Sequence, residues 1–599
     1  MKQLSRKEIN EKDKWDLTPI FKTVKDWEDE YNKVLKDIDE YEKYKGKITS
    51  SKEMFKEFLT FDESLERRLY KVYYYAHLNF DSDTTDNEYQ VLKGKTDELL
   101  QKYSVATAFI TPEILKADYE TIKSYIDSDS DLTKYSYSFE NMFRIKGHEL
   151  SDEQQLVIAS LSNVLSSPEE VYESLTDSDL KFGNIKDEKG NDVEFTESNW
   201  SIFCRSKDRN VRKNAFERLF TVYSDYKNTI ANTYTKNVDY LVNMAKLHNF
   251  NSSLEASLFN DAIDVSVYNN LIDTVNKRIK SNHNYYDVKK KVLGLDELHL
   301  YDVYARLVDK YEKKYTFEEA KELVLEALAP MGEDYTNILK KAFNERWIDV
   351  YNNKGKRGGA YSSGFYDTNP YVLLNFEGNF EDVSTLAHEL GHSMHTYLAC
   401  HNQEYVNSQY KIFVAEVAST VNELLLRLYI LNKTDDDNEK LFILNSILEL
   451  FRTTIFRQTM FAEFERDTHA LKENGEVLTP ELLSNEYYEL NKRYFGENVV
   501  VDDLIRYEWM RIPHFYYDFY VYKYSIGLSC AAYIATNIYN HTEGFLDKYL
   551  SFLKSGGSDY PANELKLAGI DVTKPDVINS AIDMFDDILQ QFKDIKGVK

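Results

Sequence analysis

The chain has 599 residues, of which 42% are hydrophobic and 29% are charged, which excludes disordered and fibrous classes of protein. Lys and Arg total 74 against 101 Asp and Glu, and this net charge of -27 repels phosphate backbones, so we expect no nucleic-acid partner. Only 21 Gly and 9 Pro are present, and because both disfavour helix interiors, their scarcity predicts a mostly α fold.

The cysteines and the apolar segments indicate the cellular compartment of the protein. Cys204, Cys400 and Cys530 lie far apart without C-x-x-C spacing, which predicts neither a disulfide framework nor a thiolate zinc site. Residues 1–21 lack the apolar run of a signal peptide, and no later stretch is apolar enough to span a membrane. We expect a cytoplasmic protein with no membrane partner.

In the first third of the chain, apolar residues spaced three and four apart predict a series of amphipathic helices from about residue 24 to residue 166. Ser151 and Gln154 form a capping-box pattern, and Pro168 suits the first turn of another helix. In residues 182–195, short runs of alternating apolar and polar residues flank a Lys-Gly-Asn turn, which predicts a β-hairpin. We place the main boundary there, between an N-terminal helical lobe at 1–190 and a second domain at 191–599.

Helical periodicity dominates the second domain, with one interruption. Residues 354–379 concentrate glycines and include a strand-like run, Tyr371 to Phe376, that predicts a small β element. On both sides of this break the spacing of apolar residues predicts helices at about 208–248, 265–293, 380–400, 409–431, 439–471, 480–493, 513–539 and 574–592.

The motif that carries chemistry is His388-Glu389-Leu390-Gly391-His392, an H-E-x-x-H pattern inside the helix predicted at 380–400. Four residues make about one helical turn, so both imidazoles lie on one face and can bind one metal ion, with Glu389 beside them as a general base. The alternative is a pair of surface histidines. The motif makes residues 191–599 the catalytic domain.

A catalytic zinc site needs a third protein ligand. A metzincin continuation is excluded, because its Gly and His positions hold His395 and Leu398. Of the two downstream carboxylates, Glu404 lies in a polar stretch, whereas Glu416 lies in an apolar helix, and a carboxylate among buried neighbours usually has a cation or metal partner. We therefore favour Glu416, beside the apolar residues Phe413, Val417 and Leu424.

Two further residues are placed to support the ligands. Glu423 lies two turns beyond Glu416 on the same face, where it can accept a hydrogen bond from the outer nitrogen of a ligating histidine. The alternative for Glu423 is an ordinary surface carboxylate. His395 shares the helical stripe of His388 and His392 and is a candidate for the same supporting role.

Together, HELGHSMH, FVAEVASTVNE and SFLKSGGSDYP resemble oligoendopeptidase F, a branch of the thimet oligopeptidase group of zinc metallopeptidases. The likeness extends to Trp15-Asp16-Leu17, to GKRGGAYSSG and to IPHFYYDFYVYKY, and so covers nearly the whole chain. The resemblance implies a two-lobed helical zincin that encloses a deep substrate channel and binds one zinc ion. It also implies oligopeptide substrates that enter only when they are short and unfolded.

An aromatic segment supplies candidate hydrogen-bond donors for the reaction. His514, Tyr517 and Tyr524 fall close to one face of the predicted helix, and relatives of the thimet type use His and Tyr residues in this region to bind the scissile carbonyl. Tyr520 and Tyr522 remain alternatives.

The predicted β element is a candidate for binding the peptide backbone. The run Tyr371 to Phe376 can offer a sheet edge to an extended peptide, and the preceding glycines let two backbones approach closely. The candidate substrate-binding residues are Gly358, Gly359, Tyr361, Gly364 and Leu373. The alternative is a plain connecting hairpin.

The sequence therefore predicts a zinc metallopeptidase that hydrolyses internal bonds of short unstructured peptides. Zinc on His388, His392 and Glu416 would activate water, and Glu389 would carry its proton to the leaving amine. Two alternatives remain: an end-trimming dipeptidyl carboxypeptidase, and a helical scaffold that binds peptides without cutting them. The presence of Glu389 argues against the scaffold, because binding alone needs no base.

Overall fold

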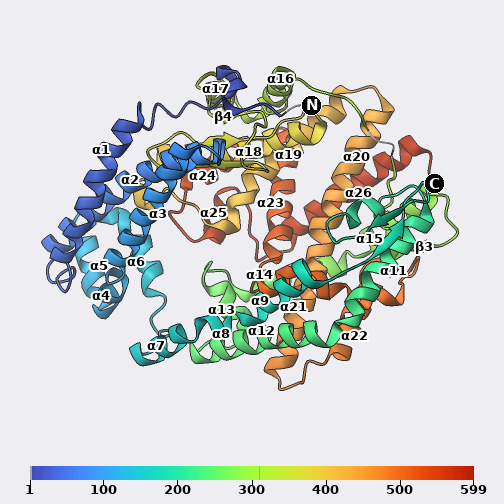
Figure 1. Cartoon of the computed structure of the whole chain (residues 1–599), viewed down its shortest axis with the longest axis horizontal. Helices are drawn as coiled ribbons and strands as arrows, with labels where there is room; N and C mark the ends of the chain where they lie inside the picture. The colour runs from blue at the N-terminus through green and yellow to red at the C-terminus, as the bar shows by residue number, and fades with distance from the viewer. Residues whose placement is uncertain (1–2, 309–310, 599) are drawn as a thin grey trace. The chain divides into compact units, whose positions relative to one another are not determined.

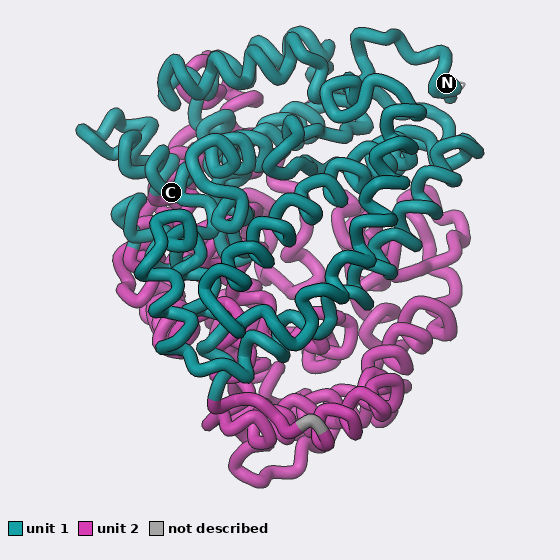
Figure 2. The backbone as a smooth tube through the Cα atoms, turned by 90° about the vertical axis from the view of Figure 1, so that its left-hand side faces the viewer, with its two compact units in different colours: residues 1–146, 312–429, 534–570 teal, residues 147–311, 430–533, 571–599 magenta. Residues whose placement is uncertain are grey.

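A computed structural model describes residues 3–308 and 311–598, and the described chain is mostly helical, as predicted (Figure 1). Contacts divide it into two compact units, each built from three segments (Figure 2). Unit 1 comprises residues 1–146, 312–429 and 534–570, and unit 2 comprises residues 147–311, 430–533 and 571–599. This division differs from a single boundary near residue 190, which stays a prediction. Among the described residues, no helix is both long and apolar enough to cross a membrane.

Unit 1 contains the N-terminal helices and the predicted metal-binding helices. Its longest helix, α2, buries Phe55, Phe58 and Leu59 in its first turns and Leu65, Leu69 and Val72 further on, which confirms the predicted amphipathic pattern. The helices that lie in unit 1 or begin there are α1 (Val24–Asp37), α2 (Lys52–Ser82), α3 (Asn87–Thr107), α4 (Ile110–Lys116), α5 (Tyr119–Asp127), α6 (Ser136–Phe143), α16 (Phe317–Ala327), α17 (Glu333–Asn344), α18 (Phe380–Asn402), α19 (Ile412–Lys433), α24 (Phe545–Ser555) and α25 (Pro561–Leu567).

A three-stranded sheet precedes α18 and has the order β4-β6-β5. β6 (Tyr371–Leu373) is parallel to β4 (Ile348–Asp349) and antiparallel to β5 (Tyr361–Ser363). The prediction that the run from Tyr371 offers a free edge is therefore wrong, because β6 is hydrogen-bonded on both sides. The two edge strands are β4 and β5, and β5 contains the candidate substrate-binding residue Tyr361.

A buried ion pair fixes the segment that leads into β5. Nζ of Lys356 lies 2.7 Å from Oδ1 of Asp349, and both side chains are fully buried. The guanidinium of Arg6 binds the same carboxylate. Because a buried carboxylate without cations would be costly, these contacts hold the loop against β4 and set the start of β5.

Unit 2 begins with short helices and the predicted hairpin, in which β1 (Asn184–Lys186) pairs antiparallel with β2 (Asp192–Glu194). A parallel pair joins β3 (Leu298–His299) to β7 (Val499–Val500). The helices of unit 2 are α7 (Asp152–Ser160), α8 (Ser162–Leu165), α9 (Ser167–Glu173), α10 (Trp200–Phe203), α11 (Arg209–Asp225), α12 (Lys227–Leu247), α13 (Ser253–Phe259), α14 (Val265–Lys277), α15 (Lys280–Val292), α20 (Asp437–Phe451), α21 (Arg457–Glu473), α22 (Pro480–Phe495) and α26 (Asp576–Lys596), and α23 (Tyr522–Tyr539) begins there.

Four of the long predicted helices are interrupted. The helix predicted at 208–248 divides into α11 and α12, and the helix predicted at 265–293 divides into α14 and α15. A π-helical turn at Arg452–Phe456 separates α20 from α21. The helix predicted at 513–539 starts only at Tyr522, after a 3₁₀ turn at Pro513–Tyr516 and two residues with positive φ, Asp518 (49°) and Phe519 (56°). The predicted single helical face for the aromatic segment is therefore wrong.

Candidate metal centre

The close packing of α18 against α19 creates the site. A Cβ atom on Gly391 would lie 2.5 Å from Cα of Ser419, closer than any side chain tolerates, so glycine lets the two backbones approach. The start of α18 is fixed by a capping box, in which Asn379 and Asp382 each accept a backbone hydrogen bond from the other. The sequence analysis did not single out Gly391, although a glycine inside a helix pattern often marks such a packing requirement.

Three ligand-type side chains converge where these helices meet. Nε2 of His388 and Nε2 of His392 lie 3.2 Å apart, and Oε2 of Glu416 lies 3.5 Å from the first and 3.6 Å from the second. A tetrahedral zinc ion bound at about 2.0–2.1 Å separates its ligand atoms by about 3.3–3.4 Å. The three atoms therefore fit one zinc ion. Among the residues that the structure describes, no other group of His, Cys, Asp or Glu has this spacing.

Glu416 is more exposed than its apolar sequence neighbours predict. Its neighbours Phe413, Val417 and Leu424 are buried as expected, but 53% of the Glu416 side chain is exposed. The carboxylate thus faces an open side of the site rather than the core. The nearby imidazoles of His392 and His388 lower the pKa of Glu416 below its usual value. The rival carboxylate, Glu404, is 64% exposed and lies 3.9 Å from Lys134, outside this group.

A carboxylate with a 17% exposed side chain, Glu423, orients the first histidine. Oε1 of Glu423 lies 2.6 Å from Nδ1 of His388, while its Oε2 accepts hydrogen bonds from Arg427 at 2.8 Å and from Ser384 at 3.1 Å. Burial alone would raise the pKa of Glu423, but His388 and Arg427 lower it to about 2. The ionised carboxylate therefore holds the proton of His388 on Nδ1 and leaves Nε2 free to bind a metal ion. Sequence analysis missed Arg427, although its i, i+4 spacing from Glu423 was visible.

Glu389 lies beside the ligands and against the edge strand β5. It is 7% exposed, and burial raises its pKa, although the neighbouring His388 and His392 and the backbone of Ser362 oppose part of the rise. Oγ of Ser362 also lies 2.8 Å from Oγ of Ser393 on α18. β5 is thus fastened to the helix that carries H-E-x-x-H, next to the candidate base.

His395 does not support the ligands in the way the sequence suggested. Its ring is fully buried and stacks on Tyr410 at 3.6 Å with an interplanar angle of 2°. Neither ring nitrogen has a hydrogen-bond partner among the described residues, and burial lowers the pKa of His395 to about 3. His395 is therefore a neutral packing residue beneath the site.

The candidate substrate-binding residues lie in three different environments. A Cβ on Gly358 or Gly359 would meet open space, whereas one on Gly364 would lie 2.6 Å from Cα of Pro370. The Tyr361 hydroxyl donates to Asp81 at 2.8 Å. Leu373 is fully buried in the central strand, so it offers no surface to a peptide, and its assignment is wrong.

The aromatic candidates belong to unit 2 and gather there despite the broken helix. The Tyr524 hydroxyl lies 3.5 Å from Nε2 of His514, and the ring centroids of His514 and Tyr517 are 5.5 Å apart. Tyr520 joins this group through a ring contact with Tyr524. Tyr522 is fully buried and is not available to a substrate.

Comparisons with known proteins agree with this fold. The model of peptidase family M3 matches residues 202–584, and the model described as Oligopeptidase F matches residues 113–182. Oligopeptidase PepF of Bacillus subtilis is 44% identical over 98% of this chain and 88% of its own length. A solved chain from Chlamydophila abortus aligns with a TM-score of 0.94 at 36% identity, over 99% of this chain and all of that one. Oligoendopeptidase-F from Enterococcus faecium aligns with a TM-score of 0.72 at 33% identity, over 96% and 99%.

The helical fold and the His-His-Glu group define a metallopeptidase. The chain belongs to peptidase family M3, whose members are zinc metallopeptidases. The match to Oligopeptidase F ends at residue 182, and the match to peptidase family M3 begins at residue 202. The hairpin of β1 and β2 lies between them.

Proposed function

We propose that the chain is a zinc-dependent oligoendopeptidase that cuts internal bonds of short unstructured peptides. The observation that carries this proposal is the triangle of ligand atoms from His388, His392 and Glu416 beside the buried carboxylate of Glu389. The names of the relatives, oligopeptidase and oligoendopeptidase, support the substrate class. A cytoplasmic location and the absence of a nucleic-acid partner stay predictions from the sequence, as does a catalytic domain that begins near residue 191.

One zinc ion per chain would be held by His388, His392 and Glu416, and when bound it supplies a Lewis acid that polarises the scissile carbonyl and acidifies water. Glu423 keeps His388 in the tautomer that can bind metal, because Nδ1 donates to its carboxylate. The positive charge of Arg427 compensates the negative charge of Glu423. Glu423 therefore does not add a second uncompensated carboxylate beside Glu416.

Glu389 would act as the general base and then as the general acid. Its carboxylate takes a proton from the attacking water and returns it to the leaving amine. Burial raises its pKa towards the range where proton transfer works in both directions, and the backbone of Ser362 lies close to its carboxylate. His514, Tyr517 and Tyr524 would donate hydrogen bonds to the oxygen that becomes negative, a role supported by their grouping in unit 2.

The edge strand β5 would bind the peptide backbone. Residues Tyr361–Ser363 are partly exposed and pair only with β6 among the described strands. An extended peptide that adds to this free edge would be aligned by main-chain hydrogen bonds, which do not depend on its sequence. Because Ser362 also contacts Glu389, the same strand would set the distance between the peptide and the base.

The test combines metal analysis with cleavage of an internally quenched peptide, with and without chelator. We expect about one zinc per chain and loss of cleavage on chelation, regained with added zinc. Mass spectrometry of products from defined peptides separates internal cleavage from release of C-terminal dipeptides. Full activity of metal-free protein would refute the proposal, and exclusive dipeptide release would favour the dipeptidyl carboxypeptidase.

A further inference from the structure

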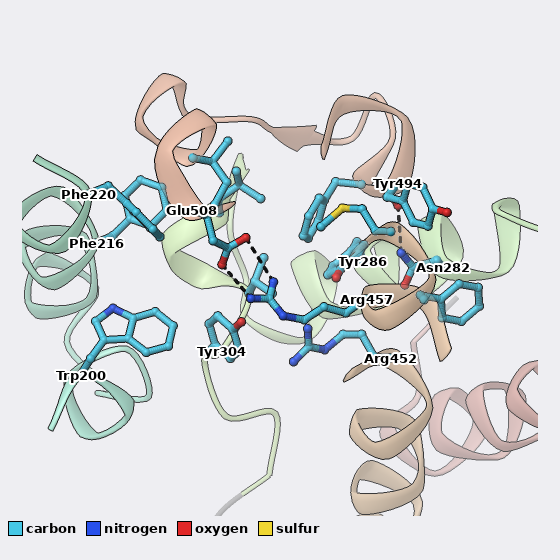
Figure 3. A pocket seen from close by; sticks show the side chains of 16 residues that line it. Trp200, Phe216, Phe220, Asn282, Tyr286, Tyr304, Arg452, Arg457, Tyr494 and Glu508 are labelled. Atoms are coloured by element: carbon cyan, nitrogen blue, oxygen red, sulfur yellow. Dashed lines mark hydrogen bonds and ion pairs between the residues drawn. The ribbon is translucent and has the colours of Figure 1, made fainter. Parts of the chain in front are cut away.

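A second candidate site lies wholly within unit 2, in a cavity with about 30 Å³ of free space. By this measure a single water molecule needs about 10–15 Å³, so the cavity holds one or two species of that size. Half of the residues that line it are aromatic, among them Trp200, Phe216, Phe220, Tyr286, Tyr304 and Phe456 (Figure 3). It shares no lining residue with the metal centre.

The π-helical turn between α20 and α21 brings two arginines to this cavity. In a π turn the hydrogen bonds run from residue i to i+5, so Arg452 and Arg457 fall on the same side of the chain. Figure 3 shows the two guanidinium groups close together beside Tyr304. Such turns are rare and often accompany functional sites, because they cost regular helical hydrogen bonding.

Around the cavity, the buried cations outnumber their carboxylate partners by one. Arg457 has its own partner, Glu508, at 2.8 and 3.2 Å. Arg452 shares Glu449 with Lys289, whose Nζ lies 3.4 Å from Oε1 of Glu449. Arg511 pairs with Glu197, and buried Arg212 shares Asp302 with the partly exposed Arg209. Two buried cations therefore depend on one carboxylate.

The guanidinium of Arg452, which shares its carboxylate partner with Lys289, lies at the wall of the cavity. Arg452 is 2% exposed, and its Nε and Nη2 donate to Glu449 at 3.2 and 2.7 Å. Its Nη1 donates to no carboxylate or carbonyl oxygen among the residues that the structure describes, and the guanidinium interacts instead with the neutral Tyr286 hydroxyl and lies 5.2 Å from the centroid of the Tyr304 ring. Burial and the positive charge of Arg452 lower the pKa of Lys289 to about 8, even though Glu449 opposes the shift.

We propose that this cavity binds a small monovalent anion of about the size of a halide, held by the guanidinium of Arg452. An uncompensated buried cation is costly, and a single negative charge at Nη1 would restore the balance with Glu449 and Lys289. The hydroxyl groups of Tyr286 and Tyr304, which line the same cavity, are available as further donors. The small free space favours an anion of halide size over phosphate, dicarboxylates and peptides. Asn282 also lines the cavity, and its unpartnered Oδ1 can accept a hydrogen bond from a water molecule beside the anion.

Bromide tests the proposal directly, because its anomalous scattering identifies it. We expect crystals of the wild-type protein soaked in sodium bromide to show an anomalous peak next to Arg452, and crystals of Arg452→Met to show none there. Arg452→Met leaves Glu449 paired with Lys289 and Tyr285, which favours a folded variant. An empty cavity, or one that contains only water, in well-soaked wild-type crystals would overturn the proposal.

Thermal unfolding gives a second readout that needs no crystals. At constant sodium and ionic strength, replacing gluconate by bromide should raise the melting temperature of the wild type saturably, by about 2 °C. The rise should be lost in Arg452→Met and kept in the control Arg278→Met, which removes a partly exposed arginine of the same unit that pairs with Asp583. An equal rise in all three proteins would mean a general salt effect and would contradict the site.

Discussion

Nδ1 of His388 lies 2.6 Å from Oε1 of Glu423, and Arg427 binds the other oxygen of the same carboxylate at 2.8 Å. This chain of contacts sets the tautomer of a proposed metal ligand from outside the ligand shell. We expect Glu423→Gln to weaken zinc binding by about 10- to 100-fold, because an amide no longer favours the proton on Nδ1. Competition with a chromophoric chelator measures the affinity. Glu404→Gln, at an exposed carboxylate, is the control and should bind zinc as the wild type does.

Glu389→Gln separates chemistry from metal binding. The amide cannot accept the proton of the attacking water, so kcat should fall by several orders of magnitude while zinc stays bound. His388→Ala, His392→Ala and Glu416→Ala should lose zinc as well as activity. Peptide cleavage and metal content, measured on the same preparations, check both claims. If Glu416→Ala kept stoichiometric zinc and Glu404→Ala lost it, the third ligand would be Glu404.

Tyr524→Phe tests the proposed donors in unit 2. Removal of one hydrogen bond that forms only in the transition state should lower kcat by about 10²- to 10³-fold and leave KM almost unchanged. Tyr517→Phe should act in the same direction. Tyr522→Phe is the control, because this neighbour is fully buried and should affect stability rather than kcat. A lowered melting temperature with unchanged kinetics in Tyr524→Phe would show a packing role.

The local parts of the site were predictable because they depend on spacing within one helix. The i, i+4 pair His388 and His392, and Glu423 two turns from Glu416, follow from helical geometry alone. The strand order did not follow, because β6 pairs with β4 across 24 residues of sequence separation at Ile348 and Val372. A short apolar run shows that a strand forms, but not which neighbours it has.

The aromatic segment shows a second limit of sequence reasoning. Its apolar spacing predicts a continuous helix, yet Asp518 and Phe519 adopt positive φ, a conformation that side chains disfavour. Buried Glu465 accepts a hydrogen bond from the backbone N–H of Phe519 at 2.7 Å, and Ser257 donates to the carbonyl oxygen of Asp518. These partners lie far away in the sequence, so only the tertiary structure reveals why the helix starts at Tyr522.

Glu564 should make stability depend on pH. It is 1% exposed, and burial raises its pKa to about 8 from an ordinary value of 4.5. The folded state therefore holds this proton more tightly than the unfolded state, so the stabilisation is complete below about pH 4.5 and is lost as the pH rises through 8. Glu564→Gln should raise the melting temperature at pH 9 and change it little at pH 5. An equal change at both pH values would show that Glu564 is already ionised in the folded protein.

Gly391→Ala should separate the two helices that carry the ligands. The new Cβ would lie 2.5 Å from Cα of Ser419 and 2.7 Å from the carbonyl oxygen of Ala418, and both are backbone atoms that cannot rotate away. Overpacking of this kind costs about 1–3 kcal/mol. Because the shift would move Glu416 away from the histidines, zinc affinity should fall together with the melting temperature.

Gly94→Ala is the matched control for this prediction. Gly94 lies in the helix α3, and a Cβ there meets nothing within 4 Å. Since alanine is the better helix former by about 1 kcal/mol, this variant should be as stable as the wild type or more stable, with unchanged zinc affinity. Calorimetry and chelator competition on both variants decide the matter. If Gly391→Ala behaved like Gly94→Ala, the spacing of α18 and α19 would not depend on the missing side chain, and another contact would have to hold Glu416 opposite the histidines.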